Sequence, residues 1–130
     1  MRKRKIKVVV LKEDLGYSAS TTIGDCFIAA EADSFDELKA RLMEAIHFTF
    51  EETGEKFTLQ ELLFEFDLES FFDFYRVINA KALSERIGMN QSLLAQYIKG
   101  IKKPSPAQTR RILKGVQQIG HELTEVRFLL

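Results

Sequence analysis

The sequence predicts an α+β chain, with a small β-β-β-α-β sheet domain over residues 1–69 and an all-α domain over residues 70–130. The first half contains short β-branched segments separated by glycine turns, which is typical of strands. The second half has apolar residues at helical spacing between asparagine caps and glycine stops. The 11 phenylalanines in 130 residues supply core for two small domains.

Charge is sorted along the chain, although its net value is zero. Up to Tyr75 there are 9 Lys and Arg against 16 Asp and Glu, a net charge of −7, and beyond it 10 against 3, a net charge of +7. Without the basic residues at positions 2–7, the first segment has 4 basic and 16 acidic residues. This asymmetry predicts that only one half of the chain meets a polyanion.

Three strands are expected at the start of the chain, over residues 5–11, 17–21 and 26–32. The first turn contains Gly16, and Gly24 with Asp25 forms the second. Cys26 is the single cysteine, which excludes a disulfide within the chain and a multi-cysteine metal site. We expect Cys26 to be a buried strand residue.

A helix follows Ser34, which forms a capping-box pattern with Glu37. We expect this helix to end near residues 53–54, where Gly54 permits a stop. Its apolar side comprises Phe35, Leu38, Leu42, Ala45, Ile46 and Thr49. Residues 62–68 alternate as a fourth strand, with Phe64, Phe66 and Leu68 on one face.

The second domain is expected to begin with an aromatic-rich helix over residues 70–78. Asn79 caps the next helix, residues 80–87, whose expected buried positions are Ala82, Leu83 and Ile87. Gly88 permits a tight reversal, Met89 fills the gap between helices, and Asn90 caps the following helix.

That following helix spans residues 91–99 and stops at Gly100. Leu94, Tyr97 and Ile98 can face inward, which leaves the side chains of Gln91, Ser92, Ala95 and Gln96 facing outward. A long helix is then expected from about Ser105 to His121.

The outward residues suit contact with DNA. Gln91, Ser92 and Gln96 are polar side chains able to reach base edges from the first turns of a helix. Phosphates would be met by basic side chains and by the amides at the Asn90 cap. The expected phosphate-contacting residues are Asn90, Lys99, Lys102, Lys103 and Arg110, with Arg111 beside them.

Residues 83–105 resemble the phage-repressor (Cro/C1, or XRE-type) helix-turn-helix family. The resemblance covers about 45 residues around this segment. It implies that Gln91, Ser92 and Gln96 face bases, and that the basic positions after Gly100 touch the DNA backbone.

The first domain resembles the HicB-type antitoxin family. The matching segments are residues 16–19, 24–26 and 34–38. The resemblance implies a degenerate RNase-H-like sheet that covers a small, basic, mRNA-cleaving toxin, with a DNA-binding domain as its companion.

Four acidic residues are candidates for partner binding: Glu37, Glu44, Glu51 and Glu52. They either steer a basic partner or form a solvated helix face. The basic tip from Arg2 to Lys5 is either an arm on DNA or a solubilising segment.

The sequence gives little support for a nuclease or a metal site. Asp14, Asp25 and Asp33 suggest a magnesium-dependent nuclease, but their spacing lacks a ligand pattern. His47 and His121 are too far apart in sequence to indicate a metal site, and we expect structural or surface roles for both. We therefore expect no catalysis, metal or cofactor.

The longest apolar run is five residues, from Cys26 to Ala30, and no apolar signal segment follows the basic N-terminus. We expect a soluble, cytoplasmic protein. The leading expectation is an antitoxin that represses its own operon. The alternative is a phage-type repressor whose first domain oligomerises or senses a ligand, without a toxin.

A homodimer is expected because one recognition helix reads few base pairs. The apolar residues of the segment 123–130 are Val126, Phe128, Leu129 and Leu130. They either pair across a dimer axis or close the core of one chain.

Overall fold

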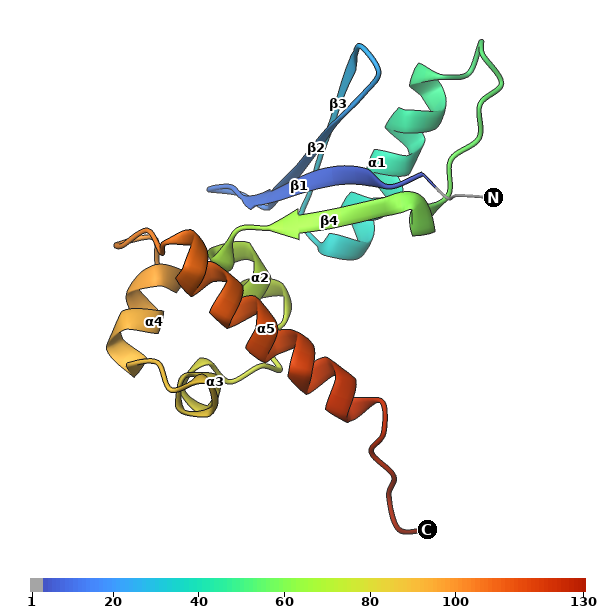
Figure 1. Cartoon of the computed structure of the whole chain (residues 1–130). Coiled ribbons are helices and arrows are strands. Elements are labelled where there is room, and N and C mark those ends of the chain that lie inside the picture. Colours follow the sequence, from blue (N-terminus) through green and yellow to red (C-terminus); the bar gives the residue numbers. More distant parts are fainter. Residues whose placement is uncertain (1–3) are drawn as a thin grey trace. The chain divides into compact units, whose positions relative to one another are not determined.

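The structure, a computed structural model, describes residues 4–130. The chain is α+β: a four-stranded mixed sheet is followed by helices (Figure 1). It divides into two units, the first ending at Phe74 and the second spanning Tyr75–Leu130. Each unit is described by itself.

Unit 1 is built on the strands β1 (Ile6–Lys12), β2 (Tyr17–Ile23), β3 (Cys26–Ala32) and β4 (Leu62–Phe66). The strand order is β3-β2-β1-β4, with β1 parallel to β4 and the other pairs antiparallel. Gly16 joins β1 to β2 at a φ of 76°, and a Cβ there would lie 2.6 Å from the Ala32 carbonyl oxygen. The turn therefore requires glycine.

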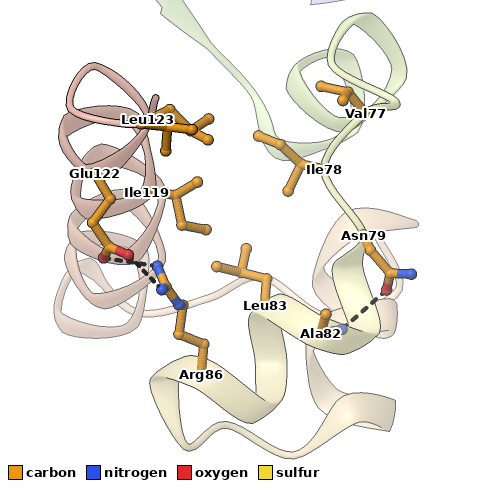
Figure 2. Close-up of a pocket in the computed structure, with 10 residues that line it drawn as sticks. Val77, Ile78, Asn79, Ala82, Leu83, Arg86, Ile119, Glu122 and Leu123 are labelled. Atoms are coloured by element: carbon orange, nitrogen blue, oxygen red, sulfur yellow. Dashed lines mark hydrogen bonds and ion pairs between the residues drawn. The ribbon is translucent and has the colours of Figure 1, made fainter. Parts of the chain in front are cut away.

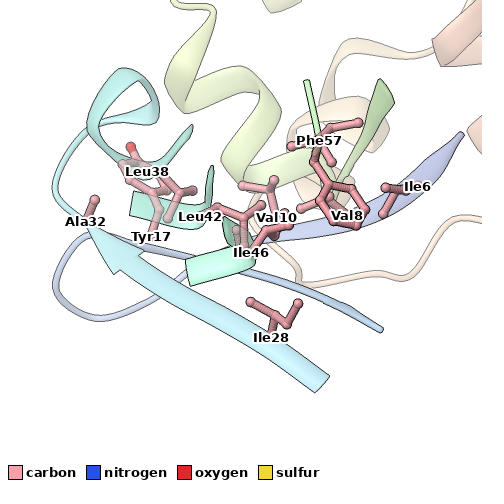
Figure 3. Packing of buried hydrophobic residues seen from close by; sticks show 12 residues of the cluster. Ile6, Val8, Val10, Tyr17, Ile28, Ala32, Leu38, Leu42, Ile46 and Phe57 are labelled. Atoms are coloured by element: carbon pink, nitrogen blue, oxygen red, sulfur yellow. The ribbon is translucent and has the colours of Figure 1, made fainter. Parts of the chain in front are cut away.

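Helix α1 (Phe35–Thr49) packs on one face of the sheet and closes the core of unit 1 (Figure 3). The helix contributes Leu38, Leu42 and Ile46, all fully buried. They meet alternate residues of the strands, because successive strand side chains point to opposite faces. The strand side chains in this core include Ile6, Val8, Val10, Tyr17, Ala19 and Ile28.

The prediction that α1 runs to residues 53–54 is wrong. The helix ends at Thr49, and the Phe50 ring packs at 5.1 Å from the Phe57 ring, a contact between residues seven positions apart. Ser34 caps α1 as expected, accepting a hydrogen bond from the Glu37 amide at 3.2 Å. The Glu37 carboxylate instead pairs with Arg41, one turn along the helix.

The fourth strand is shorter than expected because Asp67 starts a helix. Its carboxylate accepts a hydrogen bond from the Ser70 amide at 3.0 Å, so Leu68 begins α2 (Leu68–Phe74). Phe74 in α2 stacks on Tyr17 and Phe35, at 4.0 and 4.9 Å between ring centroids. This aromatic helix was expected to open the second domain, but it completes the core of unit 1.

Unit 2 consists of α3 (Ala80–Ile87), α4 (Gln91–Ile98) and α5 (Pro106–Leu123). Its buried apolar residues are Leu83, Met89, Leu94 and Ile112. Leu83 is buried as expected and Ile87 is half-buried, whereas Ala82 is exposed. The expectation for Ala82 is wrong because it assumed a broader buried face on α3.

Candidate functional site

The junction between α3 and α4 is fixed by local hydrogen bonds. The Asn79 side chain accepts a bond from the Ala82 amide at 3.0 Å and starts α3. Gly88 ends the helix with a φ of 67°, a left-handed conformation that favours glycine. The next amide, that of Met89, donates to the Ser84 carbonyl at 2.9 Å, and the Met89 side chain is buried as predicted.

Helix α4 presents a polar first turn to solvent. Asn90 caps it by accepting a hydrogen bond from the Leu93 amide at 3.2 Å. Gln91 and Ser92 are exposed, whereas Leu94 is 1% exposed and anchors the opposite side of the helix. Gln96 lies one turn beyond Ser92 and is half-buried. The structure thus exposes the two residues at the start of α4 that were expected to face bases.

The loop after α4 folds back onto the end of that helix. Gly100 has a φ of 76°, and the amides of Ile101 and Lys102 both donate to the Gln96 carbonyl, at 2.9 and 3.3 Å. These bonds satisfy a carbonyl that the helix end leaves without an intrahelical partner. They also fix the backbone from which the lysine side chains extend.

Four basic side chains in unit 2 are free to meet an anion. Lys99, Lys102, Lys103 and Arg110 are exposed, and within residues 4–130 the structure gives none of them an ion pair. Clustered lysines and arginines without acidic neighbours form the electrostatic footprint that phosphate backbones attract.

Arg111 has a structural role that the sequence analysis did not assign. Its guanidinium donates to the Ile87 carbonyl at 2.8 and 3.1 Å and to the Gly88 carbonyl at 2.9 Å. It therefore caps the C-terminus of α3 from α5, where a cation also complements the helix dipole. Arg110, its neighbour, remains exposed.

Two further contacts hold α5 against α3. Gly115 is buried, and a Cβ at this position would clash with the Ile87 side chain. Arg86 forms a bidentate ion pair with Glu122, at 2.7 and 3.0 Å. The hydrogen bond from Arg86 holds the pKa of the Glu122 carboxyl below its usual value.

The acidic residues considered for partner binding do not form one helix face. On α1, Glu44 is exposed and Glu37 is half-buried, and Arg41 lies between them and pairs with Glu37. Glu51 and Glu52 are also exposed, but they follow the end of α1. Unit 1 has more carboxylates than basic groups, but these four glutamates are not aligned along one face of a helix.

Part of the basic N-terminal tip is used within unit 1. Arg4 pairs with Glu61 at 2.8 Å and Glu55 at 3.1 Å, and its guanidinium lies 4.2 Å from the centre of the Phe57 ring. The hydrogen bond from Arg4 holds the pKa of Glu61 below its usual value. Arg4 is thus an internal tether of unit 1, and Arg2 and Lys3 lie outside the described residues.

An apolar sheet face is the surface that the sequence analysis missed. Val9, Leu11, Leu63 and Phe27 lie on the face of the sheet opposite α1 and are exposed, Phe27 by 71%. The signal was present in residues 6–11, which are apolar at the outward positions 9 and 11 as well as at the inward ones. Val9 lies between Ser20 on β2 and Glu65 on β4, so polar residues divide this face. Exposed apolar side chains of this kind supply area for contacts with other proteins.

The carboxylates weighed for a metal site are not brought together. Asp14 lies in the β1–β2 turn and Asp33 follows β3, at one end of the sheet, whereas Asp25 lies in the β2–β3 turn at the other end. Within residues 4–130, no group of three or more His, Cys, Asp or Glu side chains is placed to hold a metal ion.

The two histidines contact neighbouring groups of their own unit, and the cysteine is half-buried. His47 bonds through Nε2 to the Phe57 carbonyl at 3.0 Å, and His121 lies 3.7 Å from the Glu125 carboxylate. Cys26 is half-buried at the start of β3, which is less buried than expected. In the described part of the chain, no helix has both the length and the apolar character needed to cross a bilayer.

Comparisons of the chain with family models, curated proteins and solved structures gave no match.

Proposed function

We propose that this chain is a DNA-binding transcriptional autoregulator of the HicB antitoxin type, in which α3 and α4 form a helix-turn-helix unit. The observation that carries the proposal is the polar, solvent-facing start of α4, followed by a loop of unpaired lysines. In this proposal α4 enters the major groove, where glutamine and serine read base edges.

The contacts divide into two classes. Gln91, Ser92 and Gln96 reach base edges, while Lys102, Lys103 and the other basic residues of unit 2 neutralise phosphates. Support comes from the bonds that fix the ends of both helices: Asn79 and Asn90 cap the starts of α3 and α4, and Arg111 binds the last carbonyl of α3. A fixed orientation favours specific binding, since less conformational freedom is lost in the complex.

Unit 1 is proposed to mask a small, basic, mRNA-cleaving toxin. Its net negative charge favours a basic partner by steering the encounter. The exposed apolar side chains Val9, Leu11, Phe27 and Leu63 supply surface whose burial stabilises a complex. In this proposal Glu37, Glu44, Glu51 and Glu52 contribute mainly to the rate of association.

A second candidate is a repressor without a toxin, in which unit 1 serves only for self-association. The apolar sheet face favours it, because apolar surface pairs as well with a second copy as with a different protein. The two candidates predict different effects of Glu44→Lys. This substitution weakens binding of a basic toxin, but it leaves self-association through the sheet face unchanged.

The DNA proposal is tested with the full chain and the duplex upstream of its own reading frame, by fluorescence anisotropy over a range of salt concentrations. Gln91→Ala is expected to cost about 1–3 kcal/mol on this duplex and little on random DNA. Lys102→Ala weakens both and lowers the salt slope by about one. Gln117→Ala, an exposed glutamine on α5, is the matched control. Unchanged affinity of Gln91→Ala overturns the assignment of α4.

The toxin proposal is tested by co-expression with the protein encoded next to this chain. A small basic protein that co-purifies and whose RNA cleavage is suppressed supports it. The sheet-face variant Val9→Asp and the helix variant Glu44→Lys then separate apolar burial from charge steering, since the first raises the dissociation rate and the second lowers the association rate. If no small basic protein co-purifies with the chain, and the chain does not suppress RNA cleavage by the co-expressed protein, the second candidate is favoured.

A further inference from the structure

An apolar hollow opens on unit 2 between α3 and α5 (Figure 2). It has a volume of about 460 Å³. Its apolar lining comprises Val77, Ile78, Ala82, Leu83, Ile119 and Leu123. The ion pair between Arg86 and Glu122 lies at one side of it, so the hollow has an apolar floor and a charged rim.

The segment that leaves α5 carries apolar side chains that no residue in the described range 4–130 covers. After the helix ends at Leu123, residues 124–130 form neither helix nor strand, and the segment extends away from α5 (Figure 1). Phe128 is 86% exposed, and Leu129 and Leu130 are fully exposed. The Thr124 hydroxyl donates to the His121 carbonyl, and Arg127 donates to the Val126 carbonyl, so both polar side chains bond locally.

We propose that residues 128–130 of one chain occupy the hollow of a second copy, and that the exchange is reciprocal. The two surfaces match in chemistry, since the hollow has a mostly apolar lining and the segment exposes three apolar side chains. They are also continuous, because Leu123 and Val126, which line the hollow, lead directly into the segment. A two-fold arrangement then satisfies both copies with the same pair of surfaces.

The area fits a weak, concentration-dependent dimer. Burial of one phenylalanine and two leucine side chains removes roughly 350 Å² from water on the segment. The hollow exposes a smaller area than the segment, so two reciprocal contacts bury about 1,000 Å², the low end of specific interfaces. A single contact, as in a chain that folded its own segment back, would bury half as much.

The inference deepens the proposed function, because it names the contact that joins two DNA-binding units. Its test needs no DNA, however, and can fail or succeed independently. A dimer with no affinity for any duplex leaves the exchange standing and removes the proposed function. A DNA-binding chain that is monomeric at all concentrations does the reverse.

The experiment uses the full chain in sedimentation velocity runs over a range of concentrations. Phe128→Asp alters the segment at an exposed position, and Ala82→Glu adds bulk and charge to the hollow at the third residue of α3, where glutamate suits the helix. Each variant alone is expected to weaken dimerisation by about 10-fold or more. Leu15→Asp, at an exposed residue in the β1–β2 turn, is the matched control and leaves dimerisation unchanged.

A mixture of the two variants gives the decisive readout. Each variant alone damages both contacts of its own dimer, whereas the mixed dimer retains one intact segment in one intact hollow. Fluorescently labelled Phe128→Asp is therefore expected to associate more tightly with Ala82→Glu than with itself. Loss of dimerisation in Phe128→Asp but not in Ala82→Glu overturns the proposal in favour of segments that pair with each other. A wild-type monomer, or dimers that neither substitution affects, also overturns it.

Discussion

Unit 1 and unit 2 differ in the size of the hydrophobic core that stabilises them. In unit 1, twelve buried apolar residues lie between one helix and a sheet, and aromatic contacts from Phe35, Phe66 and Phe74 extend this core. In unit 2, four apolar residues are buried, three in the helices and Met89 in the turn between α3 and α4. The second unit therefore has much less hydrophobic stabilisation for its length.

Unit 2 compensates with specific local bonds. Each of its three helices starts at a side-chain cap, from Asn79, Asn90 and Ser105. Arg111 and Gly115 then hold α5 close to α3. Such bonds define orientation more than they add stability, which suits the proposed presentation of α4 at a fixed angle. The structure of unit 2 therefore depends on a few individual side chains, whereas that of unit 1 depends on its large hydrophobic core.

The largest expected effect follows from this difference in core size. Leu83→Ala removes a side chain that is 2% exposed and costs about 2–5 kcal/mol, enough to unfold a small unit with so few buried residues. Leu42→Ala in unit 1 is the matched change, at a position with 0% exposure. Two-dimensional NMR spectra of the full chain distinguish them. Leu83→Ala should collapse the signals of unit 2 and leave those of unit 1 dispersed. Loss of both sets together would contradict the independence of the units.

Two glycines of α5 differ in how closely they approach α3. Gly115→Ala places a methyl group against the Ile87 side chain and is expected to cost about 1–3 kcal/mol. Gly120→Ala meets nothing within 4 Å and should stabilise the helix by up to about 1 kcal/mol. Urea denaturation followed by circular dichroism measures both. The same sign for the two substitutions would mean that α5 does not approach α3 as closely as described.

Two adjacent arginines of α5 separate a hydrogen bond within unit 2 from the proposed contact with DNA. Arg111→Met loses the bonds to the Ile87 and Gly88 carbonyls and should cost about 1 kcal/mol of stability. Arg110→Met should leave stability unchanged and lower the salt slope of DNA binding by about one. If the roles are correctly assigned, thermal melts detect a change only in Arg111→Met, and anisotropy titrations detect a lower salt slope in Arg110→Met. Equal melting temperatures would remove Arg111 from its capping role.

The smallest expected effect is a loss of stability in acid, present in both units. Arg86 lowers the pKa of Glu122, and Arg4 lowers the pKa of Glu61. Because each folded-state pKa is depressed, each pair stabilises its unit above the usual glutamate pKa, and this contribution is lost as the pH falls through the folded-state value. Denaturant titrations between pH 3 and pH 7 measure it. Arg86→Gln should flatten the pH dependence of unit 2 alone, and Arg4→Gln that of unit 1 alone.

Features that depend on near neighbours were predictable from the sequence. Asn79, Gly88, Met89 and Asn90 stand within a few residues of the groups that they cap or fill, and the structure places each as predicted. The three initial strands were predicted for the same reason, since Gly16 and Gly24 mark the two turns that separate short segments rich in β-branched residues.

Features that depend on distant residues were not predictable. Arg111 binds carbonyls 23 and 24 positions earlier, and Arg4 binds Glu61, 57 positions away, so no local pattern reports either contact. The end of α1 at Thr49 reflects the packing of Phe50 on Phe57, which took precedence over the glycine signal at Gly54. Likewise, the rings of α2 are apolar enough to pack in either unit. The contacts of Phe74 with Tyr17 and Phe35, and of Phe71 with Phe66, place them in the first.

The parallel pairing of β1 with β4 has a consequence for synthesis on the ribosome. β1 lies inside the sheet, yet one of its two neighbours is encoded about 50 residues later. A nascent chain that has emerged only through α1 therefore exposes the backbone amides and carbonyls of β1 along one side, a template for pairing with other chains. Emergence of the chain through residue 74 closes that edge and adds the aromatic helix α2, before unit 2 has emerged.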